Sequence, residues 1–268
     1  MTGRQDGLAR VPSAPTGHSL LHEKVVVVTA AAGTGIGSAA ARRCLAEGAR
    51  VLVSDRHQRR LEEARAELAE EYGTDAVLAR PCDVTDDAQV RALVVAAVDG
   101  FGRIDVMVNN AGLGGTRSVA EMSDEEWNTV LDVTLSGTFR CTRAALRQMA
   151  AQDDGGVIVN NASVVGWRAQ AGQAHYAAAK AGVMALTRCA AIDAAPLGVR
   201  VNAVAPSIAM HEHLAKVTSD DLLAQLAERE AFGRAAEPWE VANVIAWLAS
   251  DYATYLTGEV VSVSSQHP

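Results

Sequence analysis

A tyrosine and a lysine four residues apart are the part of the sequence best suited to chemistry. Tyr176 and Lys180 fall in an alanine-rich segment typical of a helix, which places both side chains on one helical face. A free phenol has a pKa of about 10, but a neighbouring ammonium stabilises the phenolate and is expected to lower that value by roughly one to three units. The pair therefore predicts a tyrosine that exchanges a proton with a substrate hydroxyl or carbonyl.

A serine at the end of an apolar run gives this pair its context. Alone, a tyrosine and a lysine at this spacing are most often a packed phenol and a surface amine. Ser163 follows the expected strand over residues 156–161, and strand ends are where open α/β sheets place their sites. Its hydroxyl is expected to hold the substrate oxygen beside Tyr176 while hydride passes to or from a cofactor.

A glycine-rich turn follows the first expected strand and opens a helix. Within the run from Thr29 to Gly37, we expect contacts to a pyrophosphate from Gly33, Gly35, Ile36 and Gly37. Glycines let the backbone approach the ligand, whose charge is favoured by the free N–H groups and the positive end of the helix dipole. Taken alone, a tight turn with no ligand is the alternative interpretation.

An acidic residue at the end of the second expected strand favours a dinucleotide. Asp55 lies about 20 residues beyond Gly35, the interval at which a carboxylate meets the adenosine ribose. A carboxylate would accept hydrogen bonds from the ribose diol and repel a 2′-phosphate, so NAD is favoured over NADP. Arg56 keeps NADP as an alternative, because its guanidinium can pair with that phosphate; its other interpretation is a solvated surface charge.

The elements that must position these residues alternate along the chain. Continuous apolar strands alternating with helical-period segments predict an α/β fold, a single-domain Rossmann-type doubly wound parallel sheet. The expected strands span residues 25–29, 51–54, 77–80, 104–108, 156–161, 199–204 and 259–263, and the expected helices span residues 37–47, 61–72, 88–98, 125–150, 174–195 and 239–250. Residues 1–20 lack periodicity and are expected to form a flexible N-terminal arm ahead of an NAD(P)-binding catalytic domain over residues 21–268.

Composition excludes several classes of protein. The formal charge of −8 offers no basic footprint, so we expect no nucleic-acid partner. Neither a membrane span nor a signal peptide is expected, because the apolar runs are far shorter than the ~20 residues that cross a bilayer, and the predicted location is cytoplasmic. The cysteines at positions 44, 82, 141 and 189 lie far apart in apolar contexts, which predicts buried reduced thiols.

From Leu21 onward the chain resembles the short-chain dehydrogenase/reductase family of classical type. The resemblance is carried by the glycine turn, Asp83-Val84, Asn109-Asn-Ala-Gly112, Ser163, Tyr176 with Lys180, and Asn202-Ala-Val-Ala-Pro206. It implies a seven-stranded parallel sheet, an extended nicotinamide dinucleotide, and a homotetramer or homodimer built through long paired helices. These are expectations from the family.

The resemblance also assigns cofactor contacts along the chain. Asp83 would hold the adenine, and Lys180 would bind the nicotinamide ribose as well as assist Tyr176. The other residues expected at the cofactor by resemblance are Val84, Asn110, Ala111, Gly112, Tyr176, Pro206 and Ile208.

Four departures from the family pattern stand out. The glycine turn is one residue longer than the common form and has Ala30 where a glycine is usual. Thr134 occupies the place of the catalytic asparagine; it keeps the main-chain carbonyl that holds a water, and we expect its hydroxyl to bond back to its own helix. Ser207 replaces a glycine, and the C-terminus lacks the usual Asp-Gly-Gly. We expect the proton relay to survive these changes.

Substrate choice is expected to reside in the loops over residues 113–118, 164–172 and 207–231. Trp167, Arg168, Met210 and Phe232 could line a wide, largely apolar pocket suited to a bulky cyclic alcohol. Equally, Trp167 and Phe232 could pack at a subunit interface. We expect no metal, because His211 and His213 have no third ligand beside them.

Details of the sequence are similar to one actinobacterial branch of the family that acts in steroid C/D-ring catabolism, on a hydroxy-methyl-oxo-hydrindane carboxyl-CoA. The details are the unusual glycine turn and residues 166–170, 232–240 and 266–268. The resemblance implies a cyclic hydroxyacyl-CoA substrate, with Arg117, Arg168 or Lys216 at the CoA phosphates. Alternatives are a 3-oxoacyl-thioester reductase, a polyol dehydrogenase, or a catalytically impaired protein that senses a dinucleotide.

Overall fold

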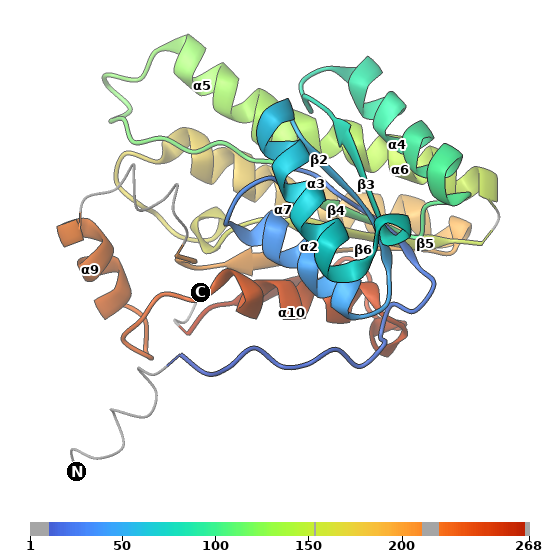
Figure 1. Ribbon diagram of the computed structural model, residues 1–268. Helices are drawn as coiled ribbons and strands as arrows, with labels where there is room; N and C mark the ends of the chain where they lie inside the picture. The colour runs from blue at the N-terminus through green and yellow to red at the C-terminus, as the bar shows by residue number, and fades with distance from the viewer. Residues whose placement is uncertain (1–10, 153, 211–219, 266–268) are drawn as a thin grey trace.

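Seven parallel strands form one sheet with the order β3-β2-β1-β4-β5-β6-β7 (Figure 1). The computed structural model describes residues 11–152, 154–210 and 220–265, without the side chains of residues 220–222. The strands are β1 (Val25–Val28), β2 (Arg50–Asp55), β3 (Val77–Pro81), β4 (Val106–Asn109), β5 (Gly156–Asn161), β6 (Val199–Pro206) and β7 (Val260–Val263). The expected seven-stranded, doubly wound parallel sheet is confirmed.

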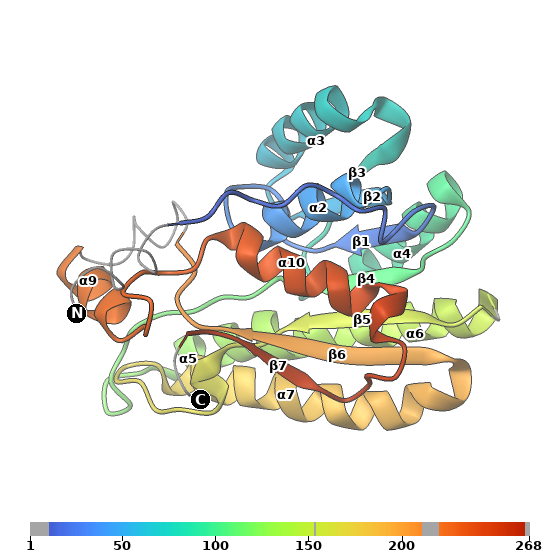
Figure 2. The same cartoon turned by 90° about the horizontal axis from the view of Figure 1, so that it is seen from below.

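Helices cover both faces of this sheet (Figure 2). One face carries α2 (Ile36–Ala46), α3 (Gln58–Tyr72) and α10 (Pro238–Ala249), and the other carries α4 (Asp87–Phe101), α6 (Gly137–Gln152) and α7 (Ala174–Ala194). The β1 run Val25–Val28 explains the two layers, because alternate valines belong to opposite cores. Val26 and Val28 pack toward α2 and α10, whereas Val25 and Val27 pack toward α4.

The strand order reverses direction beside β1. From β1 the chain moves outward to β2 and β3 and then returns to place β4 on the other side of β1. In open α/β sheets, ligands bind in the crevice beyond the carboxyl ends of the strands at such a point. The ends of β1 and β4, followed by Thr29 and Asn110, are therefore where a dinucleotide is expected.

The long helix expected over residues 125–150 is three consecutive pieces. α5 (Asp124–Leu131) and α6 are joined by a π-helical turn, η2 (Asp132–Ser136). Periodicity cannot distinguish this arrangement from a continuous helix, since a π turn adds only one residue to the local repeat. Such turns are frequent at functional sites, and this one contains Thr134.

The structure also contains α9 (Asp220–Glu228), within the segment that we expected to be a loop. Four short 3₁₀ turns complete the described elements: η1 (Thr74–Ala76), η3 (Val164–Gly166), η4 (Ala195–Leu197) and η5 (Asp251–Ala253). No helix in the described part of the chain is long and apolar enough to cross a membrane, and its acidic, histidine and cysteine side chains form no cluster of three that could hold a metal ion.

Residues 11–20 of the expected N-terminal arm run along the body beside α2 and α10 (Figure 1). The buried carboxylate of Glu47 accepts hydrogen bonds from the main-chain N–H groups of His18 at 2.7 Å and Leu20 at 3.0 Å. Arg43 pairs with Glu47 and donates to the Pro15 carbonyl. Residues 15–20 of the arm are thus attached to the body. Residues 1–10 lie outside the described residues. The domain boundary at residue 21 stays a prediction.

Three of the four cysteines are buried, as the sequence predicts. Cys44, Cys82 and Cys141 are enclosed, and burial raises the pKa of the Cys44 and Cys82 thiols to about 12. The expectation is wrong for Cys189, which is exposed. Its position on α7 falls outside the stripe of buried residues that includes Thr187 and Ala190, so its apolar neighbours do not cover it.

Buried amides join the central strands to the helices behind them. Asn109 Nδ2 on β4 donates to Asn160 Oδ1 on β5 at 2.8 Å and to Thr142 Oγ1 on α6 at 3.0 Å. Asn160 Nδ2 donates in turn to Thr187 Oγ1 on α7 at 2.9 Å. All four side chains are at most 2% exposed, so their polar groups depend on one another for hydrogen bonds.

Replacement of Asn160 by alanine should destabilise the fold strongly. The change removes the acceptor of Asn109 and the donor to Thr187, and it leaves a cavity in a site with no access to water. We expect the free energy of unfolding in urea to fall by about 3 kcal/mol. The exposed Asn128→Ala is the control and should change it by less than about 0.5 kcal/mol; equal effects of both substitutions would refute the network's importance.

Candidate active site

The structure brings Ser163, Tyr176 and Lys180 together beyond the end of β5. Lys180 Nζ lies 5.6 Å from the centre of the Tyr176 ring, as expected for residues one turn apart on α7. The ammonium donates to the main-chain carbonyl of Asn161, the last residue of β5. Lys180 is 3% exposed, so the carbonyl replaces water as its partner.

The hydroxyl group of Ser163 lies within reach of two hydrogen-bond partners. Its Oγ is 3.4 Å from the Pro206 carbonyl oxygen, and it also hydrogen-bonds Tyr176. The β5 strand ends at Asn161 and the 3₁₀ turn η3 begins at Val164, so Ser163 is held between two fixed elements. Its hydroxyl and the phenol therefore point into one site, as the sequence predicts for a pair that binds one substrate oxygen.

Burial determines the protonation of the tyrosine and the lysine. Loss of water raises the pKa of Tyr176 to about 12, while the hydrogen bond from Ser163 acts in the opposite direction. Burial lowers the pKa of Lys180 to about 7. The expectation that Lys180 alone lowers the phenol pKa below 10 is therefore wrong for the protein by itself, because loss of solvation outweighs a charge that burial also disfavours.

Thr134, in the π turn η2, is fully buried and pairs with a distant segment. Its Oγ1 accepts from the Leu113 N–H at 2.9 Å and donates to the Leu113 carbonyl at 3.0 Å. The expectation that this hydroxyl bonds back into its own helix is wrong. The Thr134 carbonyl accepts from Thr138 Oγ1 at 2.7 Å.

The segment Leu113–Arg117 forms one wall of the site. Thr134 holds its beginning at Leu113, and the Arg117 N–H donates to the Gly172 carbonyl at 2.8 Å at its other end. Between these points, a Cβ on Gly114 would lie 3.6 Å from the Tyr176 ring. The backbone at Gly114 therefore passes beside the ring of Tyr176.

The glycine turn after β1 has the geometry of a phosphate-binding turn. Gly33 has a φ of 141° and Ala30 a φ of 51°, both in the range that favours glycine. The second value explains why glycine is usual at position 30 in the family. Gly35 caps α2 without a side-chain hydrogen bond, which leaves the first N–H groups of the helix open toward an anion.

The residues after β4 pack against this turn. Thr29 Oγ1 accepts from the N–H groups of Asn110 and Ala111, both at 3.0 Å, and Asn110 Nδ2 donates to the Ala30 carbonyl at 3.1 Å. A Cβ on Gly37 would lie 2.3 Å from that carbonyl, so only glycine permits the approach. The β1 and β4 turns therefore form one rigid floor for the expected cofactor.

Gly112 connects the floor with the chemical end of the site. A Cβ added to Gly112 would lie 3.5 Å from Lys180 Nζ and 3.8 Å from Thr134 Oγ1. Gly112, Lys180 and Thr134, for which the sequence predicts different roles, therefore lie close together.

Asp55 offers a carboxylate suited to a ribose diol. It is 8% exposed at the end of β2, and its Oδ1 accepts from the His57 N–H at 3.0 Å. Within the described part of the chain, Oδ2 makes no hydrogen bond, so it is available to hydroxyl donors. Arg56 is exposed beside it, as expected for either of its two interpretations.

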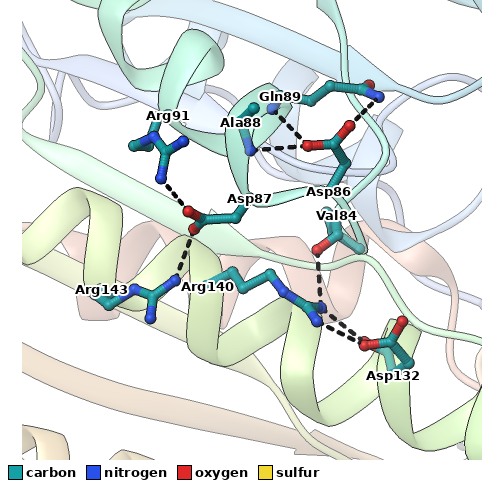
Figure 3. Close-up of polar contacts among 9 residues, drawn as sticks. All are labelled: Val84, Asp86, Asp87, Ala88, Gln89, Arg91, Asp132, Arg140 and Arg143. Atoms are coloured by element: carbon teal, nitrogen blue, oxygen red, sulfur yellow. Dashed lines mark hydrogen bonds and ion pairs between the residues drawn. The ribbon is translucent and has the colours of Figure 1, made fainter.

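Asp83 and Val84, which are expected on the adenine side, lie in a turn that is connected to the π turn. Asp83 Oδ1 accepts from Thr85 N–H and Oγ1, which orders the turn after β3. Arg140 on α6 donates to the Val84 carbonyl at 3.4 Å and to Asp132 Oδ1 at 2.8 Å (Figure 3). The side chain of Val84 is buried against Gly137.

The residues expected at the substrate are less closely grouped. Trp167 and Phe232 are 41% and 44% exposed, and Met210 is half-buried. Ile208 and Met210 exchange main-chain hydrogen bonds with Ala236, which fixes the segment after β6. Trp167 and Phe232 are therefore accessible to a ligand or to a second subunit.

The three cations expected at CoA phosphates differ in accessibility. Arg117 is half-exposed and pairs with Glu126 at 3.1 Å. Arg168 is half-buried, with two guanidinium nitrogens enclosed by the protein. Lys216, like His211 and His213, lies outside the described residues. Of the two described candidates, Arg117 is therefore the more accessible.

Sequence reasoning missed several residues that build the site. The Asn161 carbonyl, the Leu113 main chain and the Thr29 hydroxyl each hold a predicted residue in place. A main-chain N–H or carbonyl is present in almost every residue, so the amino-acid type does not show which one will bind a site residue. Thr29 and Asn161 do adjoin predicted motifs, and their polar side chains at strand ends were the available sign.

Comparisons with known proteins agree with this geometry. A family model described as enoyl-(acyl carrier protein) reductase matches residues 30–265. A protein of Mycobacterium tuberculosis is 64% identical over 97% of this chain and 99% of its own length; it is named (5R,7aS)-5-hydroxy-7a-methyl-1-oxo-2,3,5,6,7,7a-hexahydro-1H-indene-carboxyl-CoA reductase. A cis-4-hydroxycyclohexanecarboxylate dehydrogenase of Sinomonas cyclohexanicum is 42% identical over 90% of this chain and 95% of its own.

A solved structure shares the fold over almost the whole molecule. A short chain dehydrogenase from Mycobacterium smegmatis superposes with a TM-score of 0.87 at 59% identity, covering 97% of this chain and 100% of that one. The resemblance seen in the sequence is thereby confirmed. The chain belongs to the short-chain dehydrogenase/reductase family of oxidoreductases, whose members use a nicotinamide dinucleotide.

Proposed function

We propose that this protein interconverts a secondary alcohol and a ketone on the ring of a bulky cyclic hydroxyacyl-CoA, with NAD as the cofactor. The observation that carries the proposal is the meeting of Ser163, Tyr176 and Lys180 at the carboxyl edge of the sheet, where Gly112 lies beside Lys180. The names of the two relatives, one a bicyclic carboxyl-CoA reductase and the other a cyclic alcohol dehydrogenase, support the substrate class.

The residues present fit a dinucleotide. The open N–H groups at the start of α2 and the positive-φ turn before it would hold the pyrophosphate, and the free Oδ2 of Asp55 would accept from the adenosine ribose. Asp83 and the Asn110–Gly112 turn would border the adenine and the nicotinamide end. A buried carboxylate with an open oxygen favours NAD, because a 2′-phosphate beside it would be repelled.

Each catalytic residue has a distinct task. Ser163 holds the substrate oxygen, and Tyr176 takes the hydroxyl proton in oxidation or returns it in reduction. A bound oxidised nicotinamide supplies the hydride acceptor, and its positive charge favours the phenolate. Lys180, fixed by the Asn161 carbonyl, is placed to add its charge, and Thr134 fixes the wall at Leu113 and offers its carbonyl to a relay water.

We propose that Trp167 and Phe232, which are both exposed, help to receive the bulky thioester. Arg117 is the described cation that we propose for the CoA phosphates, since exchange of its Glu126 partner for a phosphate keeps the guanidinium paired. The oligomeric state stays a prediction, for which the exposed Phe139 on α6 and Ile192 on α7 are the supporting observations.

Tyr176→Phe should abolish turnover without weakening cofactor binding. Loss of the phenolic oxygen removes the proton carrier, so kcat for the bicyclic hydroxyacyl-CoA with NAD should fall about 10²- to 10⁴-fold. The Kd of NADH, measured by fluorescence, should stay within twofold. Tyr255→Phe, at a fully exposed tyrosine, is the matched control and should behave like the wild type. A Tyr176→Phe enzyme as active as the wild type would disprove the mechanism.

Asp55→Asn should shift cofactor preference toward NADP. The substitution keeps the shape of the side chain but removes the charge that repels a 2′-phosphate, so the kcat/KM ratio of NADP to NAD should rise at least about tenfold. The charge-matched control is Asp75→Asn, at an exposed residue in η1, which should leave the ratio unchanged. A wild-type enzyme that already prefers NADP would overturn the assignment of NAD.

A further inference from the structure

His175 is a buried titratable residue beside the catalytic tyrosine that the mechanism does not use. It lies in the first turn of α7 directly before Tyr176 and is 2% exposed. Its Nδ1 is enclosed and has no hydrogen-bond partner among the residues that the structure describes. An unpaired buried nitrogen is costly, so an apolar side chain would serve packing better.

The other side of the imidazole meets the wall Leu113–Arg117. A Cβ on Gly115 would lie 3.1 Å from His175 Nε2, which is tighter than ordinary contact, and 3.7 Å from its Cε1, which is ordinary contact. The backbone at Gly115 therefore passes close to the edge of the ring, and a side chain there would have to displace the ring or the wall slightly. A Cβ on the neighbouring Gly114 would lie 3.6–3.9 Å from the Tyr176 ring, in ordinary van der Waals contact.

The wall is fixed by side chains or main chain only at its two ends. Thr134 holds Leu113, and Gly172 holds the Arg117 N–H, while Gly114 and Gly115 are exposed to solvent on their outer side. No main-chain hydrogen bond is present at Gly114 or Gly115 within the described structure. Support for the middle of the wall thus comes from contact with His175 and Tyr176 beneath it.

We propose that His175 is a positioning residue that determines substrate specificity by holding the Gly114–Gly115 backbone at a fixed height over Tyr176. The inference rests on the proposed function, because the wall borders the substrate only if Tyr176 carries the reaction. A rigid group fills the space below Gly115, so the wall neither sinks onto the tyrosine nor moves away from it. A bulky bicyclic substrate is sensitive to this height, whereas a small cyclic alcohol is not.

The two contacting residues allow a complementation experiment. His175→Ala opens a space below the wall, and Gly115→Ala adds a methyl group that forces the wall away from the ring. In the double variant the added methyl enters the space left by the imidazole. The probes are the bicyclic hydroxyacyl-CoA and cyclohexanol, each oxidised with NAD, and NADH fluorescence reports cofactor binding and folding independently of substrate.

Each single variant should raise the KM for the bicyclic thioester about tenfold and change that for cyclohexanol by less than about threefold. The Kd of NADH and the pH profile of kcat should stay unchanged, and the double variant should recover to within about threefold of the wild type. His175→Gln, which keeps a polar side chain of similar reach, should behave like the double variant. His22→Ala, at an exposed residue before β1, is the control.

Contrary outcomes separate this inference from the proposed function. If Tyr176→Phe is inactive but the single variants keep the wild-type preference between the two substrates, the role of His175 is disproved alone. The same conclusion follows if the losses of the two single variants simply multiply in the double variant. If the single variants lose NADH binding as well, His175 supports the fold rather than the substrate wall, and the inference is again wrong.

Discussion

Burial of a lysine against one main-chain carbonyl connects the chemistry of this protein to its fold. Lys180 on α7 donates to the carbonyl of Asn161, which ends β5 just before Ser163. Loss of water lowers the pKa of the amine from 10.5 to about 7. Because the folded-state pKa is the lower one, the charged amine destabilises the fold below about pH 7, and the cost disappears as the pH rises to about 10.5.

The surrounding structure can be understood as support for this buried pair. The amide network behind β4 and β5 fixes the strand that carries the Asn161 carbonyl, and the π turn presents Thr134 to the Leu113 main chain. The backbone at Gly112 and Gly114 then packs beside Lys180 and Tyr176. Destabilising features such as a buried amine and the positive φ of Ala30 gather at this edge, as is common where function competes with stability.

The fold and the identities of the site residues followed from patterns within short stretches of sequence. Apolar runs of valine predicted the strands, and the Tyr176–Lys180 spacing predicted a shared helical face that the structure contains. What could not be predicted depends on contacts across many residues, such as Thr134 with Leu113, 21 positions apart. The expected direction of the Tyr176 pKa failed for the same reason, since burial is a property of the assembled site.

The protonation of Lys180 provides the most direct test of this account. The ¹³Cε chemical shift of Lys180, identified by its absence in Lys180→Met, can be followed from pH 5.5 to 11 in the protein without cofactor. The account predicts a midpoint at about pH 7, more than two units below an exposed lysine. A midpoint near 10.4, the ordinary value for lysine, would contradict it and would mean that the amine is solvated rather than buried beside Tyr176.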